Sequence, residues 1–257
     1  MNDNRLSGKI PPADVFAIGF DIGGTNLKAG LVDATGQLRV ALSEATPRTV
    51  DAFKLLAESF IAKLSSQAQI QAIGIGCKGV VDSKTTAVVS SPGDLKHLEG
   101  HCLRDLLGRT ATGKPVHSDN DARTALIAEW LWGSAKNCQN VLMLTLGTGV
   151  GGALLMQGQI VRGAHGAAGH IGHMTIDAHG PLCICGNYGC LETIFSARAI
   201  EAEAFSTAHR RVASALTGRA QPADCSEVFQ AAAESDEAAK WIIDRAILHL
   251  SAALASL

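Results

Sequence analysis

With 257 residues, the chain is long enough for two lobes, each with a hydrophobic core of its own. Its formal net charge is -2, with 18% charged residues, so the composition indicates no basic surface for DNA or RNA. No apolar run reaches membrane-spanning length and no signal peptide is evident, so we expect a cytoplasmic protein with reduced thiols and no membrane partner. Residues 1–13 predict a loose N-terminal arm.

The first half of the chain alternates short apolar runs with turn residues. Residues 15–20 and 27–32 are predicted strands on either side of a glycine turn, and residues 33–36 predict a hairpin turn into a third strand at 37–42. The hydrophobic period then becomes helical over residues 50–64. Buried strands are predicted at 72–76 and 116–118, followed by a helix at 122–132.

The second half of the chain repeats this opening. A strand at 141–146, a second glycine turn, and a strand at 153–156 come first, and helices follow at 196–208, 224–233 and 236–257. Each half therefore begins as strand, glycine turn, strand. The sequence predicts an α/β fold with two duplicated lobes and a cleft between them, divided into residues 14–121 and 122–257.

The first glycine turn contains Asp21, Gly23, Gly24 and Thr25. Adjacent glycines let backbone N–H groups approach an anion, and the threonine hydroxyl adds a donor. Because Asp21 would repel a bare phosphate, it suggests a Mg²⁺ held between this carboxylate and a nucleotide. A glycine hairpin capped by an aspartate is an equally good interpretation of this turn taken alone.

The second glycine turn, residues 147–152, formally contains the G-x-G-x-x-G pattern of dinucleotide-binding proteins. That interpretation requires a helix directly afterwards, whereas the chain here continues for four apolar residues and then turns at Gln157 and Gly158. We therefore exclude a Rossmann site. Two such turns, one in each half, instead suggest a phosphate chain clamped across a cleft.

Asp121 falls where a predicted strand gives way to a helix. It could serve as the N-cap of that helix, or as a general base that takes the proton of an attacking hydroxyl. The neighbouring Asn120 is suited to hydrogen-bonding a polyol.

Three of the seven cysteines, Cys183, Cys185 and Cys190, fall within eight positions and follow His173 closely, with two glycines between the last two. Soft N/S ligands on short loops favour a tetrahedral structural Zn²⁺ site. A redox pair or buried thiols are the alternatives, although Cys183 and Cys185 are too close in sequence to bridge easily.

Together these motifs resemble the ROK family (repressors, open reading frames and kinases) of sugar kinases, in the actin-like ATPase superfamily with its ribonuclease H-like fold. The resemblance covers roughly residues 15–257. It rests on the two glycine turns, a glycine-rich segment at 74–82, the Asn-Asp-Ala run at 120–122, the segment 169–173 and the cysteine motif at 183–192.

This resemblance implies an ATP-dependent kinase that phosphorylates the 6-hydroxyl of a hexose or N-acylhexosamine, with Asp121 as the base. The residues implied to face the sugar are Gly79, Asn120, Asp121, His170, His173 and Glu192. The residues implied to bind ATP and Mg²⁺ are Asp21, Gly23, Gly24, Thr25, Gly147, Thr148 and Gly149. The ligands implied for structural Zn²⁺ are His173, Cys183, Cys185 and Cys190. Because family members are commonly dimers, a homodimer is also expected.

The chain departs from the family pattern at His170, where the family usually has a sugar-binding glutamate, and at Asp94, where many members have a sugar-binding asparagine. The Gly-His-Ile-Gly-His run resembles bacterial N-acetylmannosamine kinases, so this sugar is expected ahead of glucose.

The end of the chain gives a third departure. Family members continue past the last helix into an adenosine-binding segment, so we expect a C-terminally truncated lobe. The sequence leaves open whether such a chain retains catalytic activity. A glucokinase and a catalytically impaired sugar-binding protein are the alternatives. A sugar-responsive repressor would need a DNA-binding segment that thirteen residues cannot supply.

Overall fold

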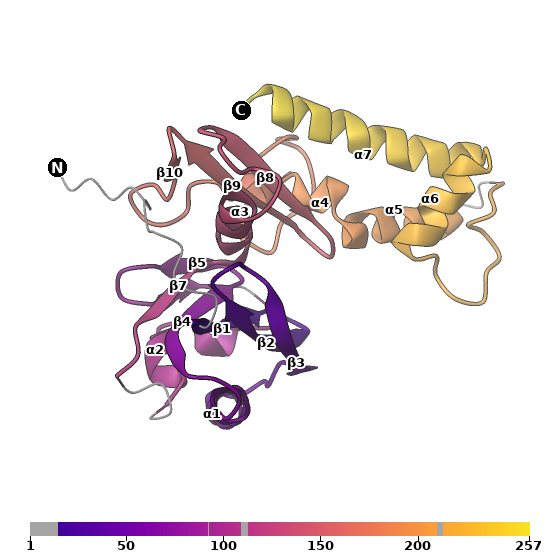
Figure 1. The fold of residues 1–257 in the computed structure, drawn as a ribbon. Coiled ribbons are helices and arrows are strands. Elements are labelled where there is room, and N and C mark those ends of the chain that lie inside the picture. Colours follow the sequence, from indigo (N-terminus) through magenta and orange to yellow (C-terminus); the bar gives the residue numbers. More distant parts are fainter. Residues whose placement is uncertain (1–14, 92, 109–112, 210–212) are drawn as a thin grey trace. The chain divides into compact units, whose positions relative to one another are not determined.

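The computed structural model describes residues 15–91, 93–108, 113–209 and 213–257. The chain forms two compact units, and Figure 1 labels the helices and strands that compose them. The first comprises Met1–Met143 and Ala153–Gly169, and the second comprises Leu144–Gly152 and His170–Leu257. The predicted loose arm at residues 1–13 lies outside the described residues.

A five-stranded sheet in the order β3-β2-β1-β4-β7 forms the centre of the first unit. Its strands are β1 (Phe16–Ile22), β2 (Asn26–Asp33), β3 (Leu38–Ala45), β4 (Ile70–Cys77) and β7 (Val116–Asn120). The first three strands form an antiparallel meander, whereas β4 runs parallel to β1 and β7 runs parallel to β4. This mixed sheet confirms the predicted α/β class.

The parallel strands of this sheet end at one level. Ile22 of β1 pairs with Cys77 of β4, and Cys77 pairs with Asn120 of β7. Since the carboxyl ends of parallel strands meet at one sheet edge, the residues that follow them gather there. These are the first glycine turn, residues 78–79, and Asp121.

Helix α1 (Val50–Ser65) provides much of the core beneath the sheet. Thr49 caps its N-terminus by accepting the Ala52 N–H. Phe53, Phe60 and Leu64 recur at helical spacing and are buried with the strand residues, each contributing about 2 kcal/mol through burial. The short helix α2 (Leu103–Leu106) packs beside α1.

The second sheet repeats the strand–turn–strand pattern, as predicted. Its order is β10-β9-β8, formed by β8 (Val141–Leu146), β9 (Val150–Met156) and β10 (Gln159–Ile160). Helix α3 (Asp121–Leu131) packs against it within the first unit, because Ala122 and Leu126 are buried with Ala153 and Leu155 of β9.

A buried charge network extends the first unit past the predicted lobe boundary at residue 121. Arg123 of α3 is fully buried, and its guanidinium donates to Asp119 at 2.8 Å and to the carbonyls of Gly166 and Ala168. Arg162 donates to the other Asp119 oxygen, also at 2.8 Å. Because one buried carboxylate is paired with two guanidinium groups, the segment around Gly166 is held to α3 and β7.

The second unit is mainly helical. Its helices are α4 (Glu192–Phe195), α5 (Ala197–His209), α6 (Cys225–Ala233) and α7 (Glu237–Ala255). Figure 1 shows α7 as one long helix, which packs on the other three, with Ile242 and Ala246 in the core. Asp224 and Glu227 form a capping box that starts α6. Among the described residues, no helix combines the length and apolar character that crossing a membrane requires.

The predicted strands and helices are confirmed, with boundaries shifted by a few residues; the helix predicted at 50–64, for example, is Val50–Ser65. Several short elements escaped prediction because they span too few residues to show a hydrophobic period. These are β5 (Val80–Asp82), β6 (Ala87–Ser90), β10, α2 and α4.

Candidate functional site

Asp121 is the first residue of α3, directly after β7. The N-cap is Asn120, whose side-chain oxygen accepts the N–H groups of Ala122 and Arg123 at 3.0 and 3.3 Å. The N-cap role that the sequence offered for Asp121 therefore belongs to Asn120. The carboxylate of Asp121 itself accepts the Ala122 N–H at 2.9 Å and the Asn120 amide at 2.7 Å.

The electrostatic surroundings favour the protonated form of Asp121. Burial raises the pKa of this carboxyl above its usual value, and the negative charge of Asp21 acts in the same direction. The hydrogen bonds from Ala122 and Asn120 and the charge of Lys78 lower the pKa without cancelling the rise. A carboxylate with a raised pKa is a stronger base, which suits proton abstraction from a hydroxyl.

Gly79 lies beside Asn120, and its carbonyl accepts the Asn120 side-chain amide at 3.0 Å. Its φ of 100° and its close approach to the Ser90 carbonyl leave no room for a side chain. The amide of Asn120 is thus divided between capping α3, binding Gly79 and orienting Asp121. The sugar contacts predicted for Gly79 and Asn120 stay predictions.

The first glycine turn is held by its own unit. Thr46 donates its hydroxyl to the Gly23 carbonyl at 2.7 Å and its N–H to the Thr25 carbonyl at 2.9 Å. Asp21 pairs with Lys28 at 3.6 Å, but both side chains are more than half exposed, so this pair is weak. The Asp21 carboxylate is therefore accessible to a cation from solvent.

Asp94, one of the departures from the family pattern, lies at the first glycine turn. The Oδ2 atom of Asp94 lies 3.0 Å from the place that a Cβ at Gly24 would take. The Oδ1 atom of Asp94 accepts from Arg48 at 2.8 Å. The turn thus has a second carboxylate beside it, supplied by a residue far away in sequence.

The second glycine turn is held from outside by Glu192, the first residue of α4. Glu192 is buried, and its Oε2 atom accepts the Val150 N–H at 3.0 Å. A side chain at Gly149 would overlap this carboxylate. Arg198 is a weaker partner, 3.4 Å from Oε1 and more than half exposed.

Two further contacts support the second glycine turn. The Ala197 N–H donates to the Gly147 carbonyl at 2.9 Å. Gly172 approaches the Val150 carbonyl so closely that a side chain at position 172 would clash with that carbonyl. The turn is thus packed against the segments that contain His173 and Cys190.

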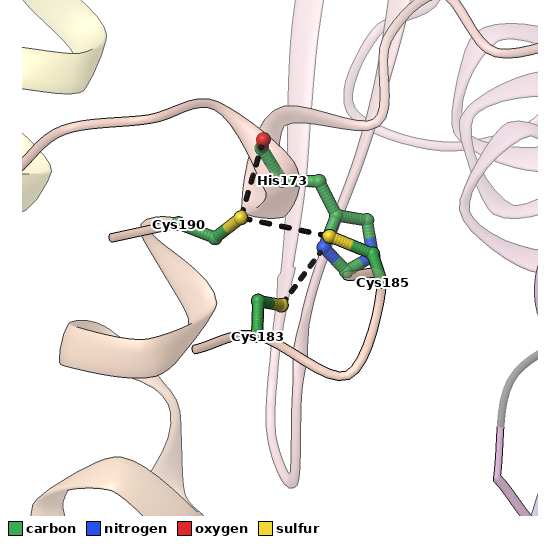
Figure 2. Close-up of side chains that lie close together, drawn as sticks. All are labelled: His173, Cys183, Cys185 and Cys190. Atoms are coloured by element: carbon green, nitrogen blue, oxygen red, sulfur yellow. Dashed lines mark hydrogen bonds between the residues drawn. The ribbon is translucent and has the colours of Figure 1, made fainter. Parts of the chain in front are cut away.

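The predicted metal ligands do converge in the second unit. Figure 2 shows His173, Cys183, Cys185 and Cys190 facing one another, with all four ligand atoms within 4.8 Å of each other. Sγ of Cys185 is 3.7 Å from Sγ of Cys190, and Sγ of Cys183 is 3.5 Å from Nδ1 of His173.

The distances between Cys185 and Cys190 and between Cys183 and His173 match the requirements of zinc. Bonds of about 2.3 Å to sulfur and about 2.1 Å to nitrogen in a tetrahedron separate two sulfurs by about 3.8 Å and a sulfur from a nitrogen by about 3.6 Å. The donor set and its spacing therefore fit a structural Zn²⁺. Burial raises the pKa of Cys190 to about 12, with further contributions from Cys185 and Cys183, so binding a cation requires the release of thiol protons.

His170 stands directly before the short 3-10 helix Ile171–His173. Its ring stacks on that of His173, with centroids 6.4 Å apart and planes inclined by 21°. The residue that departs from the family pattern thus adjoins the cluster.

The mixed sheets, paired glycine turns and Cys₃His cluster define a two-unit α/β protein with a candidate metal site. The ROK family profile matches residues 17–257, and the chain belongs to the ROK family. A glucokinase of Thermotoga maritima is 33% identical over 247 residues, 93% of this chain and 76% of that protein. An N-acetylmannosamine kinase of Escherichia coli is 32% identical over 249 residues, 93% of this chain and 77% of that protein.

A solved structure extends the comparison. The ROK family glucokinase from Streptomyces griseus, in complex with glucose and AMPPNP, superposes with a TM-score of 0.77 at 31% identity, and the match covers 94% of this chain and 78% of that one. The predicted family and fold class are therefore confirmed.

Three features of these sites were not predicted from the sequence. Lys78 follows β4 at the level of the first turn and influences Asp121. Arg123 pairs with Asp119, and the four-residue spacing of these opposite charges is a signal that could have suggested the pair. No local sequence pattern indicates the contact of Glu192 with the second turn, because the two partners are 42 residues apart.

Proposed function

We propose that this chain is an ATP-dependent sugar kinase that transfers the γ-phosphoryl group to the 6-hydroxyl of a hexose or N-acylhexosamine. The observation that carries the proposal is the Asp121 carboxylate. It lies at the sheet edge that also carries the first glycine turn, and its pKa is raised. The kinase relatives, at 33% and 32% identity, support the same reaction class.

In the proposed reaction, Asp121 accepts the proton of the sugar 6-hydroxyl while the hydroxyl oxygen bonds to the γ-phosphorus. The bond between this phosphorus and the bridging oxygen breaks, and ADP leaves with that electron pair. Asn120 contributes by orienting the carboxylate through its 2.7 Å hydrogen bond.

For the nucleotide, we propose that the backbone N–H groups and threonine hydroxyls of the two turns bind the phosphates. The residues are Gly23, Gly24, Thr25, Gly147, Thr148 and Gly149. Mg²⁺, when bound at Asp21, would supply positive charge that stabilises the transferring phosphoryl group.

We further propose that His173, Cys183, Cys185 and Cys190 hold a structural Zn²⁺. The closed set of four protein ligands supports this role, because a catalytic zinc keeps a position for water or substrate. The ion would fix the loop that carries His173 and Glu192.

For the sugar, we propose contacts from Gly79 and Asn120 in the first unit and from His170, His173 and Glu192 in the second. N-acetylmannosamine is the favoured substrate because of the imidazole of His170, which replaces the usual glutamate. Glucose is the second candidate, supported by the glucokinase relative at 33% identity. We also propose a homodimer, which light scattering during size-exclusion chromatography tests.

ATP-coupled turnover on a panel of hexoses and N-acetylhexosamines tests the proposal. We expect phosphorylation of N-acetylmannosamine or glucose, with the product phosphorylated at the 6-position as read by NMR. Sugar binding without turnover on any member of the panel would instead favour a catalytically impaired sugar-binding protein.

A further inference from the structure

The Cys₃His cluster and the second glycine turn are joined by two very short connections. Gly172 directly precedes the ligand His173 and packs on the Val150 carbonyl. Glu192 follows the ligand Cys190 by two residues and accepts the Val150 N–H at 3.0 Å. The backbone carbonyl and the N–H of Val150 are therefore both contacted by residues that lie within two positions of a proposed metal ligand.

We infer that Glu192 is a positioning residue that couples occupancy of the Cys₃His cluster to the affinity of the second glycine turn for nucleotide. The inference rests on the proposed function, in which this turn binds phosphate. An ion that fixes His173 and Cys190 also fixes Gly172 and Glu192, and these residues hold the turn with its free N–H groups available. Without the ion, the same connections transmit the loosening of the loop to the turn.

The burial of the Glu192–Val150 hydrogen bond makes this coupling strong. The Val150 N–H is buried, so a substitution that removes its acceptor leaves an unpaired donor away from water. The turn must then rearrange to satisfy that donor. Arg198 is a weaker, exposed partner at 3.4 Å, so the Val150 N–H is the main hydrogen-bond partner of Glu192.

The test measures binding of Mg²⁺–AMPPNP by isothermal titration calorimetry without sugar, on zinc-loaded and chelator-stripped protein. Zinc removal should weaken nucleotide binding by the wild type about tenfold. Glu192→Leu should weaken binding by the zinc-loaded protein to a similar extent, whereas Glu192→Gln, which keeps an oxygen acceptor, should stay within about threefold. In Glu192→Leu, zinc removal should have a smaller further effect than in the wild type, because only the Gly172 contact then links the cluster to the turn.

A second pair of variants covers the case in which the leucine variant fails to fold. Cys185→Ser removes an exposed ligand of the cluster, and Cys138→Ser removes an exposed cysteine outside it. Only the first should weaken nucleotide binding and speed hydrogen exchange of the backbone N–H groups at residues 147–152.

Nucleotide affinity that is unchanged by zinc removal and by Cys185→Ser would overturn the coupling and leave the proposed function intact. Additive effects of zinc removal and Glu192→Leu would also overturn it, since the two would then act separately. If the zinc-loaded wild type binds no Mg²⁺–AMPPNP at all, the proposed nucleotide binding by the turn is wrong. The coupling, which depends on that binding, is then wrong as well.

Discussion

The two glycine turns occupy equivalent places in the strand–turn–strand repeat but are stabilised differently. The first turn is held by Thr46, which comes 23 residues after its partner, Gly23, and the turn has an exposed carboxylate of its own in Asp21. The second turn has no acidic residue of its own and is held by the buried carboxylate of Glu192, which comes 42 residues after its partner, Val150.

This difference indicates a division of work between the two units. The first unit contains Asp121, Asp21 and their turn at one sheet edge, where charge can act on a reacting group. In the second unit, the turn is held by Glu192, which follows Cys190 of the Cys₃His cluster by two residues. Substitutions in the first unit should therefore change chemistry, and those in the second should change nucleotide binding and local stability.

The largest expected effect is that of Asp121→Asn in the first unit. Loss of a general base should lower kcat about 10²- to 10⁴-fold, while the Km for ATP changes little, because the substitution keeps the size of the side chain. Steady-state kinetics with the preferred sugar measure this, and circular dichroism checks the fold. A kcat close to that of the wild type would remove Asp121 from the mechanism.

Metal removal should act on the second unit. At free zinc about a thousandfold above its Kd, the ion stabilises the folded protein by about 4 kcal/mol, which a chelator would remove. Hydrogen exchange should speed up around residues 183–192 and 147–152, whereas the five-stranded sheet should keep its protection. Equal loss of protection in both units would contradict the proposed division.

A matched set of glycine substitutions compares the two turns directly. Gly149→Ala places a methyl group against buried Glu192 and should cost about 1–3 kcal/mol. Gly147→Ala meets nothing within 4 Å and should stay within about 0.5 kcal/mol. In the first turn, Gly24→Ala faces only the exposed side chain of Asp94, which can move aside, so its cost should also be small.

Urea unfolding monitored by circular dichroism gives these costs. A cost for Gly24→Ala as large as that of Gly149→Ala would show that the two turns are equally constrained, and the comparison between them would fail.

The features that the sequence predicts best are those with local spacing. The hydrophobic period identified α1, and the cysteines converge with His173 because only short glycine-containing loops separate them. The glycine turns were found for the same reason. Each of these signals lies within about twenty residues of chain.

The features that escaped prediction depend on long-range packing. Arg123 binds carbonyls more than forty residues away, and this network carries the first unit past residue 121, where the sequence placed the lobe boundary. Whether Asp121 or Asn120 caps α3 depends on the exact residue at which the helix starts. Sequence patterns do not locate a helix start to within one residue.

Specificity is a finer test of the second unit. His170→Glu should shift the ratio of kcat/Km values towards glucose and away from N-acetylmannosamine by about tenfold, because a carboxylate accepts sugar hydroxyls that an imidazole binds differently. His165→Glu, at an exposed position of the first unit, is the control and should leave the ratio unchanged. An unchanged ratio in His170→Glu would assign specificity to other residues.

The smallest expected effect concerns the electrostatic cost of Asp121 to the first unit. Burial raises the pKa of this carboxyl in the folded protein, so the folded state binds the proton more tightly than the unfolded chain does. The protonated group therefore stabilises the fold at low pH, and this contribution is lost as the pH rises through the raised folded pKa. Asp121→Asn does not titrate and should not show the loss.

Urea unfolding at a series of pH values, starting below the usual aspartate pKa of about 3.9, measures this difference. The free energy of unfolding of the wild type should fall relative to that of Asp121→Asn as the pH increases through that window. Glu44→Gln, which removes an exposed carboxylate of β3, should follow the wild type. If the wild-type and Asp121→Asn curves run parallel, the carboxyl has no raised pKa, and the strongest argument for Asp121 as a tuned base is lost.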